Sequence, residues 1–276
     1  MLEHSGVMSK IMNTENLKIP IAIIVAGVFI AIAVYLSNAN PQKLADNSNV
    51  QDSLSSPTEY TFTKIRPVTE TDHIVGNPTA DVIFIEHSDT ECPFCKSFHA
   101  TMNKVVDEYA KGGKVAWVYR HMPIDELHSK SRNEAEATEC VASLGGEKAF
   151  WTFINRLYDA TPSNNGLNPE TLPALAYEVG IKEEIFTKCL ADRTFKAKVQ
   201  ADFQDGVIAT NNQPATPNSV VILKTPLTKS SVEKLQLAFA QYGMILGVST
   251  DNTMIQFGGG LPYDIINLVI ATAINQ

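Results

Sequence analysis

The amino-acid sequence predicts an α/β domain whose mixed sheet is interrupted by a block of helices, with one apolar helix ahead of it. An apolar run at Val82–Ile85 is typical of a buried strand, and Lys96–Tyr109 after it has helical spacing of apolar residues. Helical patterns then follow between residues 124 and 210. Two further apolar runs, Ser219–Leu223 and Thr253–Phe257, predict strands that complete the same sheet. Strands on both sides of a helical block indicate a mixed sheet with helices on its faces.

The N-terminal part contains a segment suited to a membrane. Residues 19–37 carry no charged side chain, and their apolar part would form a helix roughly 27 Å long, close to the thickness of a bilayer core. Lys10 and Lys18 precede this segment and Lys43 follows it, which predicts a cytoplasmic N-terminus at residues 1–18 and export of the rest. We expect an uncleaved transmembrane signal anchor. A cleaved signal peptide and a buried core helix are the alternatives.

Composition separates a linker from a folded domain. Residues 38–67 are rich in Asn, Ser, Gln, Asp, Pro and Thr, the composition of a flexible tether. The folded domain is expected at 68–276, with its helical insertion at about 124–210. The chain has 22 Lys and Arg against 30 Asp and Glu, a formal net charge of -8. A nucleic-acid-binding face needs an excess of basic residues, so no nucleic acid partner is expected.

Cys92 and Cys95, in C-x-x-C spacing, follow the first strand and stand where the next helix begins, with Pro93 suited to its first turn. Free backbone N–H groups at a helix N-terminus stabilise a thiolate, the species that attacks disulfides. The pattern therefore predicts a redox pair in which Cys92, the more exposed residue, is the nucleophile and Cys95 is the buried partner. The alternatives are half of a zinc site, a purely structural Cys92–Cys95 disulfide, and two reduced core cysteines.

The other candidate metal ligands do not form a pattern. Cys140 and Cys189 lie far apart, and no histidine has the spacing of a zinc finger. His87 is expected at a strand end, and His121 and His128 in a loop near the substrate groove. No metal site is predicted.

Five helical patterns occupy the inserted block, separated by segments rich in glycine, proline and asparagine. They cover Arg132–Leu144, Glu147–Tyr158, Pro169–Val179, Lys182–Leu190 and Thr194–Thr210.

Together these features resemble the DsbA-like thiol:disulfide oxidoreductases, a family with a thioredoxin fold. The resemblance begins at Thr71–Gly76, includes the C-x-x-C pair, continues through Lys114–Pro123 and Ala135–Val141, and ends at Met254–Asp264. Thr216-Pro217 resembles the threonine and cis-proline that face the redox pair in that family. The resemblance implies a thioredoxin-like fold with an inserted helical domain.

The resemblance also implies a substrate-binding set. Pro93 and Phe94, between the two cysteines, and Thr216 and Pro217 would contact an extended substrate, with Pro217 cis. One local departure is Ala215, where the family usually has glycine.

Glu86 stands on the first strand where the family often carries an acidic residue beneath the redox pair. A buried carboxyl without a cationic partner has a raised pKa, which suits it to exchange a proton with Cys95. A half-exposed glutamate at the strand end is the alternative.

Cys140 and Cys189 fall on predicted helices of the inserted block, at positions that resemble those where family members carry cysteine. We expect a structural disulfide between them, and two reduced core cysteines are the alternative.

A second departure is the long connection at residues 226–252, which the family usually makes short. Ser230–Glu233 has the pattern of a capping box and predicts an extra surface helix. Such a helix either binds a partner or covers the sheet edge, and we expect it to cover the edge.

The resemblance implies an exported oxidase that introduces disulfide bonds into secreted proteins. We expect a single-pass cell-membrane protein with an extracytoplasmic catalytic domain, held in the lipid bilayer by its N-terminal helix and active as a monomer without a cofactor. Its expected partners are unfolded or reduced secreted proteins and a membrane oxidase that recycles the pair. A reductase or isomerase of the same fold and a non-catalytic chaperone-like module are the alternatives.

Overall fold

The computed structural model describes residues 65–275. The predicted cytoplasmic segment, the predicted signal anchor and residues 38–64 of the predicted linker lie outside the described residues. Between residues 65 and 275, no helix is long and apolar enough to cross a bilayer.

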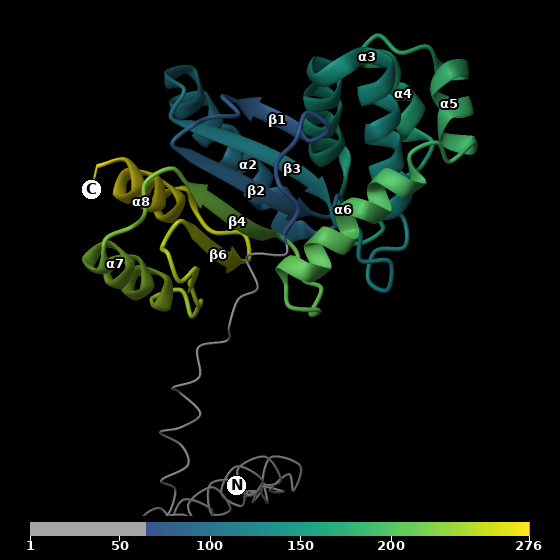
Figure 1. Ribbon diagram of the computed structural model, residues 1–276. Helices are drawn as coiled ribbons and strands as arrows, with labels where there is room; N and C mark the ends of the chain where they lie inside the picture. Colours follow the sequence, from purple (N-terminus) through teal and green to yellow (C-terminus); the bar gives the residue numbers. More distant parts are fainter. Residues whose placement is uncertain (1–64, 276) are drawn as a thin grey trace, which may run out of the picture. The chain divides into compact units, whose positions relative to one another are not determined.

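The described residues form a sheet of six strands in the order β1-β3-β2-β4-β6-β5 (Figure 1). Strands β2 and β3 run parallel, and every other neighbouring pair is antiparallel. The predicted mixed sheet is therefore confirmed. The strands are β1 (His73–Gly76), β2 (Val82–Ser88), β3 (Val115–His121), β4 (Asn218–Leu223), β5 (Gly247–Val248) and β6 (Met254–Gly258).

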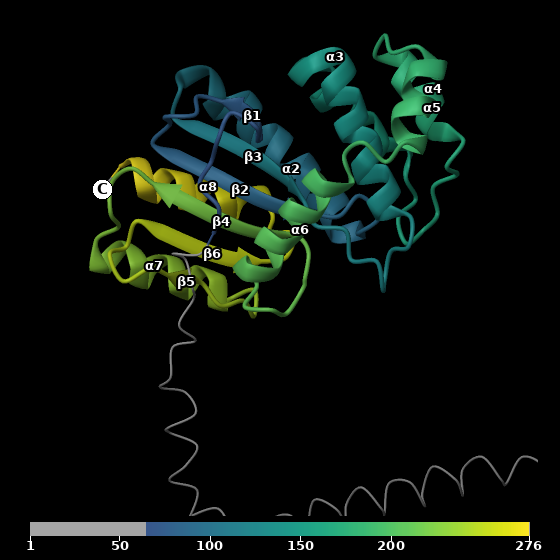
Figure 2. The same ribbon diagram turned by 45° about the vertical axis from the view of Figure 1, so that its right-hand side comes forward.

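The helices fall into a block beside the sheet and a layer against it, as Figures 1 and 2 show. The block contains α3 (Ser131–Ala160), α4 (Thr171–Glu178) and α5 (Glu183–Ala191). From it α6 (Lys196–Ala209) runs against the other face of the sheet, where it contacts β2, β3 and β4. The remaining helices are α2 (Pro93–Tyr109), the short 3-10 helix η4 (Ala110–Gly112), α7 (Lys229–Ala240) and α8 (Tyr263–Ile274). The two helices predicted at Arg132–Leu144 and Glu147–Tyr158 both form and are confirmed. They share the span of α3 but are separated by a kink at Gly146, where φ is 76° and the backbone is not helical. Glycine adopts this left-handed conformation without the cost that a side chain would add.

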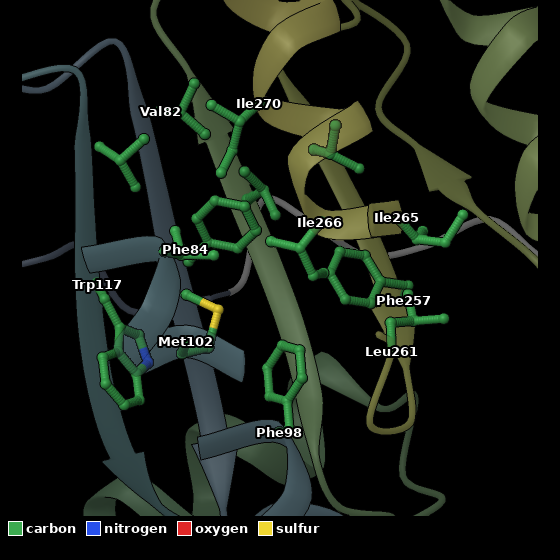
Figure 3. Close-up of a cluster of buried hydrophobic side chains, with 14 of the residues drawn as sticks. Val82, Phe84, Phe98, Met102, Trp117, Phe257, Leu261, Ile265, Ile266 and Ile270 are labelled. Atoms are coloured by element: carbon green, nitrogen blue, oxygen red, sulfur yellow. The ribbon is translucent and has the colours of Figure 1, made fainter. Parts of the chain in front are cut away.

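The main core lies between one face of the sheet and helices α2 and α8 (Figure 3). Along β2, Val82 and Phe84 point to this face because side chains alternate along a strand. Phe98 from α2 and Ile266 from α8 meet them there. The same alternation places Glu86, two residues beyond Phe84, on this face at the end of β2 where the redox pair lies.

The opposite face of the sheet holds a buried ionic cluster centred on Arg120 of β3. Its guanidinium contacts Asp72 at 2.8 Å and Asp205 of α6 at 2.6 Å. Arg66, predicted as part of the linker, joins this cluster through ion pairs to Asp72 and to Asp202 of α6, at 3.0 and 2.7 Å. Residues 65–67 therefore belong to the folded domain, because the charge of Arg66 is paired with it and the carbonyls of Arg66 and Pro67 accept hydrogen bonds from Arg120.

The long connection at 226–252 covers the edge of the sheet. Leu235 and Phe239 of α7 are buried in the main core, and β5 pairs with β6 as the outermost strand. The predicted capping box at Ser230–Glu233 is wrong. The cap of α7 is Thr228, whose hydroxyl accepts a hydrogen bond from the Ser231 backbone N–H at 3.2 Å.

Candidate active site

The turn between β2 and α2 is held by hydrogen bonds before the cysteines begin. Asp89 accepts hydrogen bonds from the backbone N–H groups of Glu91 and Ile124, at 2.9 and 2.8 Å. The carbonyl of Glu91 accepts one from the N–H of Asn164, at 2.8 Å, in the loop after α3. The redox pair is thus anchored to both the sheet and the helical block.

Cys92 caps the N-terminus of α2 in an extended conformation, and Pro93 begins the helix. The hydrogen bond from the Cys95 thiol is the largest influence on Cys92 and lowers its pKa to about 6, against the opposing effect of burial. Backbone N–H groups of Cys95 and Phe94 and a contact with Thr216 act in the same direction. The helix N-terminus contributes as expected, through these backbone N–H groups, and the Cys95 thiol is the largest single cause.

Cys95 lies one turn into α2 and is fully buried, while Cys92 is only 4% exposed. Both have free thiols. Burial, followed by the hydrogen bond and charge of Cys92, raises the pKa of Cys95 well above its ordinary value. The pair is therefore asymmetric, with a stable thiolate at Cys92 and a neutral thiol at Cys95. Cys92 is the more exposed of the two cysteines, as the sequence predicts.

Glu86 is fully buried, so a half-exposed glutamate is excluded. Its Oε2 accepts a hydrogen bond from Trp117 Nε1 at 2.9 Å, and Oε1 has no hydrogen-bond partner among residues 65–275. Burial raises the pKa of Glu86 to about 8, although hydrogen bonds from Ser88 and Trp117 partly oppose the shift. A carboxyl with this pKa can both give and take a proton near neutral pH.

The predicted substrate-binding residues lie around Cys92. The Thr216-Pro217 bond is cis, and the Cys92 thiol donates to the Thr216 carbonyl at 3.5 Å. Phe94 is 65% exposed, so a large apolar side chain stands beside a nearly buried nucleophile. Gly260 backs onto Phe94, since a side chain at this position would come within 2.7 Å of the Phe94 carbonyl oxygen.

A disulfide joins Cys140 of α3 to Cys189 of α5, with the two Cα atoms 6.0 Å apart. It lies in the hydrophobic core of the helical block and is separate from the redox pair.

Sequence reasoning missed three hydroxyl groups near Cys95. Ser88 Oγ lies 2.9 Å from the hydroxyl of Tyr158, which in turn lies 3.0 Å from that of Tyr119. A signal existed for Ser88, because strand alternation places it on the same side as Glu86. Tyr158 comes from α3 and is brought here only by the tertiary fold.

The histidines have structural partners. His87 contacts Asp205 at 2.8 Å and His128 contacts Asp89 at 3.0 Å. His121 is the last residue of β3 and buried, so its predicted loop position is wrong. In the part of the chain that the structure describes, no group of three or more metal-ligating side chains is found.

Comparison with known proteins identifies the family of this chain and solved structures that share its fold. A family model described as thioredoxin matches residues 68–237. The Na(+)/H(+) antiporter NhaA 1 of Mycobacterium sp. (strain KMS) is 35% identical over 170 residues, 60% of this chain and 26% of that protein. The chain thus spans about a quarter of the length of this curated relative.

Two solved structures share the fold. BdbD from Bacillus subtilis, in oxidised form, has a TM-score of 0.56 and 23% identity, with 76% of this chain and 97% of that chain covered. The thiol-disulfide exchange protein alpha-DsbA2 from Wolbachia pipientis has a TM-score of 0.52 and 17% identity, with 73% and 86% covered. At these identities, the likeness concerns the arrangement of helices and strands.

Proposed function

We propose that this chain, which belongs to the thioredoxin family, is a thiol-disulfide oxidoreductase whose Cys92–Cys95 pair introduces disulfide bonds into exported proteins. The observation that carries this proposal is the asymmetry of the pair. A thiolate that is stable at Cys92 favours the reduced enzyme as a product, so the disulfide form is an oxidant.

The reaction moves two electrons from a substrate dithiol to the enzyme disulfide. A substrate thiolate attacks Cys92 Sγ, the Cys92–Cys95 bond breaks, and its electron pair goes to Cys95 Sγ, which takes a proton. The second substrate thiolate then attacks the substrate sulfur of the mixed disulfide. It releases Cys92 as a thiolate and leaves a disulfide in the substrate.

Glu86 is proposed to supply the proton that Cys95 takes and to accept it again when the pair is reoxidised. Among residues 65–275, the hydrogen bond that the carboxyl of Glu86 accepts comes from Trp117, and burial is the largest cause of its raised pKa. With a pKa near 8, it carries a proton in most molecules at neutral pH and can lose it at little cost.

The proposed substrate is an unfolded chain with reduced cysteines. The exposed Phe94 ring offers an apolar contact that accepts many sequences, and the Thr216–Pro217 segment lies alongside for an extended backbone. Few charged side chains lie among these residues, which suits clients of varied composition.

The proposed location is the outer face of the cell membrane, with residues 19–37 as a single-pass anchor. The support is the uncharged stretch and the lysines before it. A recycling oxidase in the same membrane would take the two electrons from Cys92 and Cys95. Protease accessibility of the folded domain in intact cells, compared with lysed cells, tests the location.

Incubation of the purified protein with a reduced, unfolded protein that regains activity only when its disulfides form tests the function. We expect stoichiometric oxidation by the disulfide form and none by Cys92→Ala. Glu86→Ala, which leaves both cysteines in place, should oxidise more slowly but reach the same end point. Faster reduction of insulin than oxidation of the unfolded protein would favour the reductase or isomerase, and no exchange in either assay would favour a binding module.

A further inference from the structure

The two groups that trade a proton in the redox cycle are closed off from solvent. Cys95 and Glu86 are both fully buried. Each time Cys95 becomes a thiol it takes a proton, and Glu86, if it gives that proton, must regain one before the next turnover. Reoxidation sends a proton the other way. A path for protons must therefore connect this buried pair to water.

Ser88 begins such a path. It follows Glu86 by two residues on β2 and shares its side of the strand. The Ser88 hydroxyl lowers the pKa of both Glu86 and Cys95, the effect of a donor that lies near both groups. The next residue, Asp89, donates its backbone N–H to Cys95 Sγ at 3.4 Å. On its other side, Ser88 Oγ lies 2.9 Å from the hydroxyl of Tyr158.

Tyr158 continues the path to a groove between α2 and α3. This groove has a volume of about 750 Å³, and Tyr158 lines it together with His99, Asn155 and Asp159. The His99 ring stacks on Tyr158 with centroids 4.4 Å apart, and its Nδ1 has no partner among residues 65–275. For the path to work, water in this polar groove must exchange protons with the Tyr158 hydroxyl. Among residues 65–275, the contacts of that hydroxyl are Ser88, Tyr119 and the Asp89 carbonyl.

We propose that the hydroxyls of Ser88 and Tyr158 carry protons between the buried Cys95–Glu86 pair and the water of the groove between α2 and α3. The inference rests on the proposed function, since the path has a use only if the pair cycles.

Neither hydroxyl needs to ionise for this transfer. Each oxygen accepts a proton from one side as it releases its own hydrogen to the other, so the charge moves while Ser88 and Tyr158 end neutral. Burial raises the pKa of Tyr158 well above its ordinary value, which keeps a tyrosinate from forming. The path therefore works in both directions of the redox cycle.

Tyr119 provides the matched control. Its hydroxyl lies 3.0 Å from that of Tyr158, so it makes a similar hydrogen bond, but Tyr119 is fully buried and does not line the groove. It is a side branch that leads to no water. Loss of its hydroxyl removes a hydrogen bond from the same cluster and leaves the path from Ser88 through Tyr158 intact.

The experiment measures how fast dithiothreitol reduces the disulfide form of the full-length protein in detergent micelles, by acid quenching and thiol trapping in H2O and D2O. We expect Ser88→Ala and Tyr158→Phe to slow the reaction at least about tenfold and to enlarge its solvent isotope effect, because proton delivery becomes limiting. Tyr119→Phe should stay within about twofold of wild type, and Tyr158→Phe should keep the wild-type redox equilibrium with glutathione.

Wild-type rates in both path variants would overturn the inference, as would slow rates with an unchanged isotope effect or an equal loss in Tyr119→Phe. If Tyr158→Phe does not fold, by circular dichroism, Ser88→Ala decides alone. The proposed function fails separately. A wild-type protein that exchanges but equilibrates as a strong reductant refutes the oxidase while the variants still test the path, and one that never exchanges refutes both.

Discussion

At the scale of single residues, the proposed disulfide exchange depends first on the thiolate of Cys92. Its pKa near 6 means that the thiolate is present at neutral pH and is lost as pH falls through 6. We expect the ultraviolet absorbance of the thiolate in the reduced protein to titrate with a midpoint near pH 6. Cys92→Ala should abolish this transition, and Cys95→Ala should move it upward because the main hydrogen-bond donor is lost. A wild-type midpoint near that of a free thiol, about 8.5, would contradict the geometry.

Glu86 is expected to speed disulfide exchange and to lower the stability of the folded protein. Its pKa is about 8 in the folded protein and ordinary in the unfolded chain, so between about pH 4.5 and 8 the folded state holds a proton that the unfolded state has released. The cost to stability grows with pH across that window and levels off above it. Glu86→Gln should therefore raise the free energy of unfolding by on the order of 2 kcal/mol at pH 8 and by little at pH 5, measured with urea.

The same variant should slow disulfide exchange by at least about tenfold, because an amide cannot trade a proton with Cys95. Glu126→Gln, in the loop after β3, is the matched control and should change neither property. A loss of stability in Glu86→Gln, or unchanged exchange, would show that Glu86 acts as a structural group.

Four site residues could be predicted from the sequence, namely Cys92, Cys95, Thr216 and Pro217. The C-x-x-C motif and the later Thr-Pro pair mark them, in that order along the chain. The burial of Glu86 could not, because it depends on Trp117, Tyr119 and α3 packing over the end of β2. Chain position places Glu86 at a strand end, and only the tertiary fold decides whether that end is covered.

At the scale of elements, the Cys140–Cys189 disulfide ties α3 to α5. It closes a loop with a sequence separation of 49 residues. In the chain-entropy model, such a loop contributes roughly 4 kcal/mol. The double variant Cys140→Ala, Cys189→Ala should lose about this much unfolding free energy in urea and still exchange disulfides at Cys92 and Cys95. Loss of disulfide exchange in a folded double variant would contradict a purely structural role and show that exchange at Cys92 and Cys95 depends on this disulfide.

The long helices and the central strands could be predicted from periodicity, and the edges of the sheet could not. Strand β1, at His73–Gly76, has only four residues, and β5, at Gly247–Val248, has two, too few for an alternation to show. The cap of α7 was misplaced by two residues because Thr228, Ser230 and Ser231 are all good cap residues. Which of them caps depends on where Leu235 and Phe239 must point to reach the core.

At the scale of the whole molecule, the Arg120 cluster joins the sheet, the segment at 65–67 and α6. Arg120→Met should lower the free energy of unfolding by about 3 to 5 kcal/mol, because Asp72 and Asp205 are left buried without their cation. Lys188→Met, which breaks the exposed pair with Asp192, is the control and should cost less than about 1 kcal/mol. An equal effect of the two variants in urea would contradict the role of the cluster.

The same cluster determines how the free energy of unfolding changes at low pH. Burial raises the pKa of Asp205, but His87 and Arg120 outweigh it and hold the pKa at about 2, below the ordinary value of 3.8. The stability that Asp205 contributes is therefore full above about pH 4 and is lost as pH falls through 2. The wild-type protein should lose stability in this window, and Asp205→Asn should flatten the loss. An unchanged slope of unfolding free energy against pH in the variant would contradict this assignment.

The redox equilibrium of the protein with glutathione, with thiol trapping to show which cysteines respond, tests the central claim most directly. We predict that Cys92 and Cys95 equilibrate at a potential well above that of thioredoxin, higher than about -200 mV, while Cys140 and Cys189 stay bridged. A potential near about -270 mV, that of thioredoxin, would contradict the oxidase and make the pair a donor of electrons to its substrates.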